Sequence, residues 1–285
     1  MKTISHEALF WRKLAHWGAS KGPEWWVRYS PPFFGWAAAA LVPSARHAVH
    51  NNLLRIRGAV PRARNASEIL ATFSTYASCL AEALSTAEVG PRAPEAAIVG
   101  LEHAHAAFAL KRGVVLVTAH TAGWDIVGPL LARDHALPML IVMAQERDGG
   151  ARALHDDVRV RSGVHIVHVG DPLASISLLR HVQSGGVVAL QLDRTVVGMR
   201  TRKVSLLGGQ GEVPEGPLRL AQASGAPILP VFCSRTGYRQ YIIEVFESIS
   251  LTRRADAAEL DRAATELAAV MTTFLQKHPT QWFHF

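Results

Sequence analysis

The stretch Gly113–Pro129, GVVLVTAHTAGWDIVGP, decides the fold, because it predicts a strand, a tight loop and a helix in direct succession. Val114–Val117 are apolar and mostly β-branched without a helical period, which is typical of a buried strand. His120 stands where that strand ends, and the small residues after it suit a turn. Trp124 then opens an apolar segment that we expect to be helical to about His135. A strand, loop and helix in this order form the repeating unit of α/β proteins.

The rest of the chain continues this alternation. Further strands are predicted at Pro138–Met143, Val164–Val169, Gly186–Leu190, Lys203–Leu207, Ile228–Phe232 and Gln240–Phe246. Further helices are predicted at Arg46–Gly58, Ala66–Thr86, Glu95–Leu110, Gly149–Ser162, Pro172–Ser184, Pro214–Ser224 and Asp256–Lys277. The sequence therefore predicts a layered αβα domain over residues 46–285 with a largely parallel central sheet, preceded by a helical region over residues 1–45.

Composition and charge narrow the class of protein. The 285 residues are 49% hydrophobic and carry a formal net charge of +7, enough apolar material for one large core. No nucleic-acid-binding motif accompanies the positive charge, so we expect an anionic membrane surface or an acidic partner rather than nucleic acid. A surface kept soluble by excess charge is the alternative. The two cysteines, Cys79 and Cys233, show no CxxC spacing and fit a reducing compartment.

The amino-terminal segment is amphipathic. Lysine and arginine residues are interleaved with large apolar residues that lie near helical spacing. These apolar residues are Leu9, Phe10, Leu14 and Trp17. That composition is typical of a helix lying in a membrane interface, although the same face would also pack on the domain. No apolar run is long enough to cross a bilayer and no leader is evident, so we expect peripheral attachment.

His120 and Asp125 form a candidate general-base pair. The loop between them is short enough to turn back, so that the carboxylate accepts a hydrogen bond from one ring nitrogen while the other takes a proton from a hydroxyl or amine. The alternative is a loop histidine beside a helix N-cap aspartate. No GxSxG elbow supports a serine nucleophile. His103 and His105 point to different faces of a helix, and we expect no metal.

Several blocks together resemble one protein family. HTAGWD at 120–125 resembles the HxxxxD box of the glycerolipid acyltransferase superfamily, in the branch of the lipid A late acyltransferases (lauroyl/myristoyl type) and the related phosphatidylinositol mannoside acyltransferases. Five further stretches of this sequence resemble blocks of that branch and occur in the same order. They are QLDR at 191–194, VSLLG at 204–208, EVPEGPLRLA at 212–221, GAPILPV at 225–231 and PTQWF at 279–283.

This resemblance implies a reaction without cofactor or covalent intermediate. A fatty acyl group would pass from an acyl thioester, carried by acyl-carrier protein or coenzyme A, to a hydroxyl or amine of a lipid or glycolipid. His120 would deprotonate the acceptor, Asp125 would orient His120, and the backbone amides of Gly123 and Trp124 would face the developing oxyanion. Because no spanning segment or leader is evident in the sequence, we expect peripheral attachment at the cytoplasmic face of the bacterial inner membrane, where the acyl donors are made. A thioesterase or lipid hydrolase using the same pair on water, and a non-catalytic lipid-binding protein, are the competing hypotheses.

The resemblance also implies substrate-binding residues, namely Arg147, Arg159, Asp193, Arg194 and Glu215. A guanidinium at these positions suits a donor or headgroup phosphate. An internal ion pair between Asp193 and Arg194, and a first-turn helix acid at Glu215, are the structural alternatives. An apolar groove is expected for the acyl chain, with candidates that serve equally well as core: Pro129, Leu130, Leu131, Met143, Leu190, Trp282 and Phe283. The Glu212–Glu215 block departs from the family pattern, so acceptor recognition is expected to differ from that of lipid A.

Overall fold

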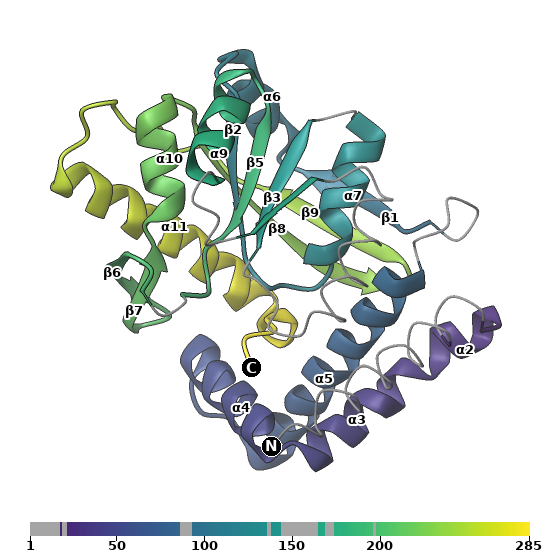
Figure 1. The fold of residues 1–285 in the computed structure, drawn as a ribbon. Helices are drawn as coiled ribbons and strands as arrows, with labels where there is room; N and C mark the ends of the chain where they lie inside the picture. The colour runs from purple at the N-terminus through teal and green to yellow at the C-terminus, as the bar shows by residue number, and fades with distance from the viewer. Residues whose placement is uncertain are drawn as a thin grey trace, which may run out of the picture.

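A seven-stranded sheet forms the centre of the computed structural model, in the order β1-β9-β8-β2-β5-β3-β4 (Figure 1). All neighbouring strands are parallel except β8 and β9, which are antiparallel. The structure describes residues 18, 22–85, 93–135, 138–143, 165–168, 174–195 and 198–285. The strands are β1 Glu95–Val99, β2 Val114–Thr118, β3 Met139–Met143, β4 His165–His168, β5 Val187–Gln191, β8 Ile228–Gly237 and β9 Gln240–Val245. The predicted, largely parallel sheet is confirmed.

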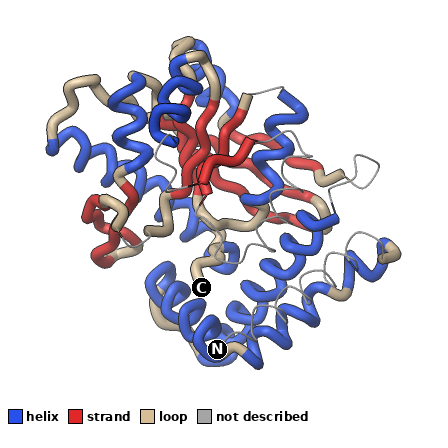
Figure 2. The backbone as a smooth tube through the Cα atoms, in the orientation of Figure 1, coloured by secondary structure: helices blue, strands red, loops and turns tan. Residues whose placement is uncertain are grey.

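Helices cover both faces of this sheet, as Figure 2 shows with strands in red between helices in blue. Alternate residues of β2 enter two different cores: Val115 and Val117 join one, while Val114 and Leu116 join the other. The first core is closed by α9 Ala174–Gln183, α10 Gly216–Ser224 and α11 Ala257–Lys277. The second is closed by α5 Arg62–Ser85, α6 Leu101–Ala109 and α7 Trp124–His135. The layered αβα prediction is therefore confirmed.

The predicted helix Glu95–Leu110 is wrong in its first third. Residues Glu95–Val99 form the edge strand β1, and α6 begins only at Leu101. Gly100 separates them with φ +78°, and a Cβ there would lie 2.1 Å from the carbonyl oxygen of Val245. The alanines of β1 favour helix locally, so pairing with β9 decided the outcome.

The strand predicted at Lys203–Leu207 exists but lies outside the main sheet. β6 Thr201–Leu206 pairs antiparallel with β7 Gly209–Pro214, a strand that the sequence did not predict because of its polar, glycine-rich composition. Leu207 and Gly208 connect them with φ +54° and +73°, the positive values that a two-residue hairpin turn of type I′ requires.

Helices α2 Glu24–Tyr29, α3 Pro31–Leu41 and α4 Pro43–Arg57 precede α5. Helices α3 and α4 bury a small core of their own with α5, made of Ala39, Val49, Leu53, Ile69 and Phe73. The predicted boundary between 45 and 46 falls inside α4. The predicted helix Gly149–Ser162 and the amphipathic segment with Leu9, Phe10, Leu14 and Trp17 lie outside the described residues. Among the helices that are described, none combines the length and apolar character needed to cross a bilayer.

Candidate active site

His120 leaves β2 at its carboxyl end and meets Asp193, which follows β5. Nδ1 of His120 lies 2.9 Å from Oδ1 of Asp193, and the His120 main-chain N–H donates to Oδ2 over 3.1 Å. Both side chains are buried. Because β2 and β5 are parallel neighbours, with Thr118 beside Gln191, the loops after them start at the same edge of the sheet. The structure therefore brings His120 and Asp193 together at this edge.

Asp193 is held as a carboxylate. Burial opposes its ionisation, but hydrogen bonds from the ring and main chain of His120, the charge of that ring and the indole of Trp282 outweigh burial and lower the pKa of Asp193. An ionised carboxylate only accepts hydrogen bonds, so Nδ1 of His120 carries the proton and donates. The other ring nitrogen, Nε2, is then the basic one, as a general base requires.

The carboxyl-terminal segment completes this arrangement. Nε1 of Trp282 donates to Oδ2 of Asp193 over 2.9 Å. The Phe283 N–H donates to the carbonyl of His120 over 2.8 Å, and the Ala122 N–H donates to the carbonyl of Gln281 over 3.1 Å. The sequence pointed to this segment only as a family block and an apolar lining. The signal available was its indole N–H, since a buried tryptophan needs an acceptor.

The carboxylate on Nδ1 is thus Asp193, whereas the sequence assigned that role to Asp125 and a substrate role to Asp193. Asp125 lies in the first turn of α7 and lines the cavity described below. Its orienting role stays a prediction. Sequence spacing favoured Asp125 because it is near His120 along the chain, but the parallel pairing of β2 and β5 brings Asp193 to the ring.

The amides predicted to face an oxyanion already have partners. Trp124 N–H donates to the carbonyl of Thr121 over 3.2 Å, and the main chain of Gly123 hydrogen-bonds the Cys79 thiol. Gly123 has φ +87°, and a Cβ there would lie 2.8 Å from Sγ of Cys233. Both amides thus have partners within the protein, and their oxyanion role stays a prediction.

An apolar cavity opens beside this site, between α7 and the sheet. Its empty volume is about 670 Å³, which includes the open solvent at its mouth. Trp124 lines it and also contacts the ring of His120, with ring centroids 5.0 Å apart. The lining includes three predicted groove residues, Leu131, Met143 and Leu190, together with Leu116, Met139, Ile141, Val142, Val231 and Phe232. Trp282 and Phe283 are core residues instead.

Two exposed arginines lie at the same edge of the sheet. Nη2 of Arg194 donates to the carbonyl of Phe283 over 2.7 Å, and Nη2 of Arg55 donates to the carbonyl of Leu206 over 3.2 Å. These acceptors are neutral, and in the described part of the chain neither guanidinium forms an ion pair. The predicted Asp193–Arg194 ion pair is therefore not formed, and Arg194 keeps its charge available for an anion.

The charges of Asp193, Arg194 and Arg55 all act on the ring of His284. Its ring stacks on Trp282 at a centroid distance of 5.0 Å and an interplanar angle of 17°. Burial lowers the pKa of His284, the Asp193 charge acts in the opposite sense, and the Arg194 and Arg55 charges lower it further. Both guanidinium groups thus act on a ring that stacks directly above the indole holding Asp193.

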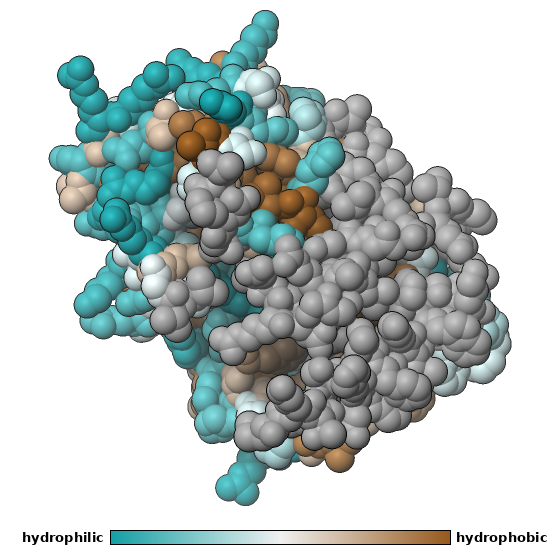
Figure 3. All heavy atoms as spheres, viewed as in Figure 1, coloured by the Kyte–Doolittle hydropathy of each residue, from teal (hydrophilic) through white to brown (hydrophobic). Residues whose placement is uncertain are grey.

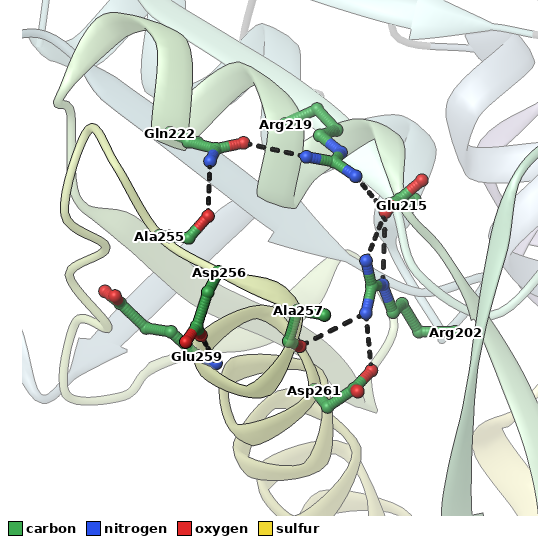
Figure 4. A network of polar contacts seen from close by, with 9 residues as sticks. All are labelled: Arg202, Glu215, Arg219, Gln222, Ala255, Asp256, Ala257, Glu259 and Asp261. Carbon is green, nitrogen blue, oxygen red and sulfur yellow. Dashed lines mark hydrogen bonds and ion pairs between the residues drawn. The ribbon is translucent and has the colours of Figure 1, made fainter.

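Glu215 serves a network of ion pairs, drawn in Figure 4. Its Oε1 accepts from Nη2 of Arg202 over 2.7 Å and lies 2.9 Å from Nη2 of Arg219. Arg202 in turn pairs with Asp261 over 2.7 Å. Burial raises the pKa of Glu215, but the hydrogen bonds and charges of Arg202 and Arg219 outweigh burial and lower this pKa. The network ties β6 and β7 to α10 and α11. A substrate contact for Glu215 stays a prediction.

The remaining predicted site residues are placed as follows. Arg147 and Arg159 lie outside the described residues. His103 and His105 belong to α6. Within the ranges that the structure describes, no group of three or more histidine, cysteine, aspartate or glutamate side chains has the arrangement of a metal site.

Comparison with known proteins gives concordant results. The family model described as bacterial lipid A biosynthesis acyltransferase matches residues 4–285. A phosphatidylinositol mannoside acyltransferase of Mycobacterium tuberculosis (strain ATCC 25618 / H37Rv) is 25% identical over 98% of this chain and 88% of its own. The protein of that name from Mycolicibacterium smegmatis is 24% identical over 66% of each chain. A crystal structure of the 1-acyl-sn-glycerophosphate acyltransferase PlsC from Thermotoga maritima is 13% identical, with a TM-score of 0.41 over 86% of this chain and 93% of that one.

Proposed function

The chain belongs to the bacterial lipid A biosynthesis acyltransferase family, and on that premise we propose that it transfers a fatty acyl group from a thioester to a hydroxyl or amine of a lipid, with His120 as general base. The observation that carries the proposal is the buried His120–Asp193 pair beside an apolar cavity. Acyl-carrier protein or coenzyme A carries the acyl group, and no further cofactor takes part.

The chemistry follows from the protonation of the pair. Nε2 of His120 takes the proton of the acceptor hydroxyl or amine as it attacks the thioester carbonyl. Asp193 stabilises the imidazolium that forms, and the imidazolium then returns the proton to the departing thiolate as the C–S bond breaks. The acyl group is never bonded to the protein. Asp125, at the cavity wall, stays the second candidate for orienting the ring.

The cavity suits the acyl chain. Its lining is apolar, and each methylene buried there contributes about 0.8 kcal/mol. Because Trp124 lies between the cavity and the His120 ring, a chain seated in the cavity brings its carbonyl end toward His120. This placement supports a donor that carries a long acyl chain over a donor that carries a small acyl group.

Arg194 and Arg55 suit the phosphate of the donor or of the acceptor headgroup. Both are exposed, donate otherwise to carbonyl groups, and keep further N–H donors for a phosphate. The relatives named phosphatidylinositol mannoside acyltransferase suggest an anionic glycolipid acceptor. We propose an acceptor of that class.

The amino-terminal helices suit a membrane surface. The exposed aromatic side chains of α2 and α3, here called the aromatic face, are Trp25, Trp26, Tyr29, Phe33, Phe34 and Trp36. Figure 3 shows separate brown patches at the surface in the lower part of this view. Exposed aromatic rings of this kind are typical of interfacial attachment. We propose peripheral attachment to the cytoplasmic face of the bacterial inner membrane.

One assay tests the proposal against hydrolysis and mere binding. Purified protein is supplied with radiolabelled acyl-CoA or acyl-carrier protein, with and without an inner-membrane lipid extract. We expect label in a lipid only when the extract is present, and a loss of about 10²- to 10⁴-fold in His120→Gln. His105→Gln, an exposed histidine of α6, is the matched control. Free fatty acid at an unchanged rate without acceptor would instead indicate a hydrolase, and no turnover a binding protein.

A further inference from the structure

We propose that Trp282 is a positioning residue, whose indole N–H holds the Asp193 carboxylate at the angle that keeps His120 in its basic tautomer. The inference builds on the proposed function. Trp282 is not among the residues that line the cavity, and the hydrogen bond that its indole donates within the described part of the chain goes to Oδ2 of Asp193, so any polar effect of the indole on His120 passes through Asp193.

The two oxygens of Asp193 have different tasks. Oδ1 faces Nδ1 of His120 at 2.9 Å. Oδ2 accepts from the main chain of His120 at 3.1 Å and from the indole of Trp282 at 2.9 Å. Because Oδ2 is held from two directions, the carboxylate cannot rotate about its own axis without losing a charge-assisted hydrogen bond. Oδ1 therefore stays aligned with Nδ1.

Trp282 is itself held in place. Its side chain is 3% exposed, and its ring stacks on that of His284. Its main chain forms an antiparallel bridge with Thr121, directly after His120. The residue that fixes the carboxylate is thus bonded to the same loop that carries the base, so loop, carboxylate and indole move together.

A tryptophan is needed here for its N–H and not only for its volume. The position lies in the main core, where phenylalanine fills space nearly as well. Only the indole supplies a donor, and a buried carboxylate that loses one donor loses stabilisation equivalent to about 10- to 100-fold in an equilibrium. We expect that loss in kcat/KM, because the ring of His120 is then less often presented with Nε2 unprotonated and aligned.

Trp282→Phe tests the proposal. We expect kcat/KM to fall about 10- to 100-fold and KM for the acyl donor to stay within twofold. Phe73→Leu, in the separate core of the amino-terminal helices, controls for a loss of packing. In the Asp193→Asn background the same change is expected to cost less than twofold.

A second variant keeps the shape of the side chain. Benzothienylalanine at 282 replaces the indole N–H by sulfur, and we expect it to behave as Trp282→Phe does. Wild-type kcat/KM in this variant would overturn the proposal. So would an equal loss in the wild-type and Asp193→Asn backgrounds, since Trp282 would then act on stability and not through Asp193.

A readout without turnover separates this inference from the proposed function. In protein labelled with ¹⁵N-histidine, the resonances missing from His120→Gln identify the ring of His120. We expect protonated Nδ1 and unprotonated Nε2 in the wild type, and a mixture of tautomers in Trp282→Phe. An unchanged tautomer would contradict the inference even in an active enzyme. If Trp282→Phe shows the mixture of His120 tautomers but the wild-type protein transfers no acyl group, the inference about Trp282 holds and only the proposed function is contradicted.

Discussion

The ring of His120 packs against the indole of Trp124, with centroids 5.0 Å apart and planes inclined by 60°. Trp124 is the first residue of α7 and also lines the apolar cavity. One aromatic side chain therefore contacts both the proposed base and the space proposed for the acyl chain. The Nδ1 side of the His120 ring is occupied by Asp193.

The two aspartates are expected to differ in importance. Asp193→Asn replaces the carboxylate on Nδ1 by an amide that can present N–H to the ring, which disfavours the basic tautomer. We expect kcat/KM to fall about 10²- to 10⁴-fold, against less than about tenfold for Asp125→Asn. Steady-state kinetics on both purified variants decides this. The opposite order would return the orienting role to Asp125.

Ile141 is expected to influence chain-length preference. It lies on β3 in the cavity wall, and Ile141→Phe adds volume where a methylene chain would lie. Each methylene that no longer fits costs about 0.8 kcal/mol, or about fourfold in kcat/KM. We expect the preferred acyl chain to become shorter, measured as relative kcat/KM for donors of graded length. Ile176→Phe, on the exposed side of α9, is the control and should preserve the wild-type ratios.

The aromatic face is expected to bind vesicles. Phe33→Ser combined with Trp36→Ser removes two large exposed rings from α3 without touching a buried side chain. Because burial of one such ring contributes about 1.5–3 kcal/mol, we expect sedimentation with anionic vesicles to weaken at least about tenfold. Leu110→Ser, an exposed apolar residue after α6, serves as control. Binding equal to wild type in the double variant would exclude this face as the membrane contact.

Glu215 is expected to contribute stability that depends on pH. Its folded pKa is lowered, so its contribution is complete above the unfolded value of about 4.3 and disappears as the pH falls through the folded value. For Glu215→Gln we expect a free energy of unfolding about 2 kcal/mol lower at pH 7, with a smaller difference at pH 3. Urea denaturation at both pH values measures this. A variant as stable as wild type but defective in transfer would support the substrate role instead.

Much of the fold was predictable because its signals are local. The apolar runs of β2, β5 and β8 are buried on both sides, and continuous burial leaves a pattern that alternation with polar residues would have broken. The misassigned segment, Glu95–Val99, is an edge strand rich in alanine, where local preference and final structure disagree. The hairpin strand β7 escaped prediction for the same reason, since its glycines and polar residues resemble a loop.

The sequence by itself determined that His120 ends a buried strand, that a small-residue turn follows, and that an α/β sheet presents this turn at its carboxyl edge. Each of these depends on residues near one another in the chain, whose burial and backbone preferences act locally. Only the tertiary structure decided which carboxylate holds His120 and that Trp282 secures it. Asp193 reaches the ring because β2 and β5 pair in parallel, and Trp282 because the last residues of the chain bridge to Thr121. Such contacts depend on strand order, which hydrophobic pattern alone does not specify.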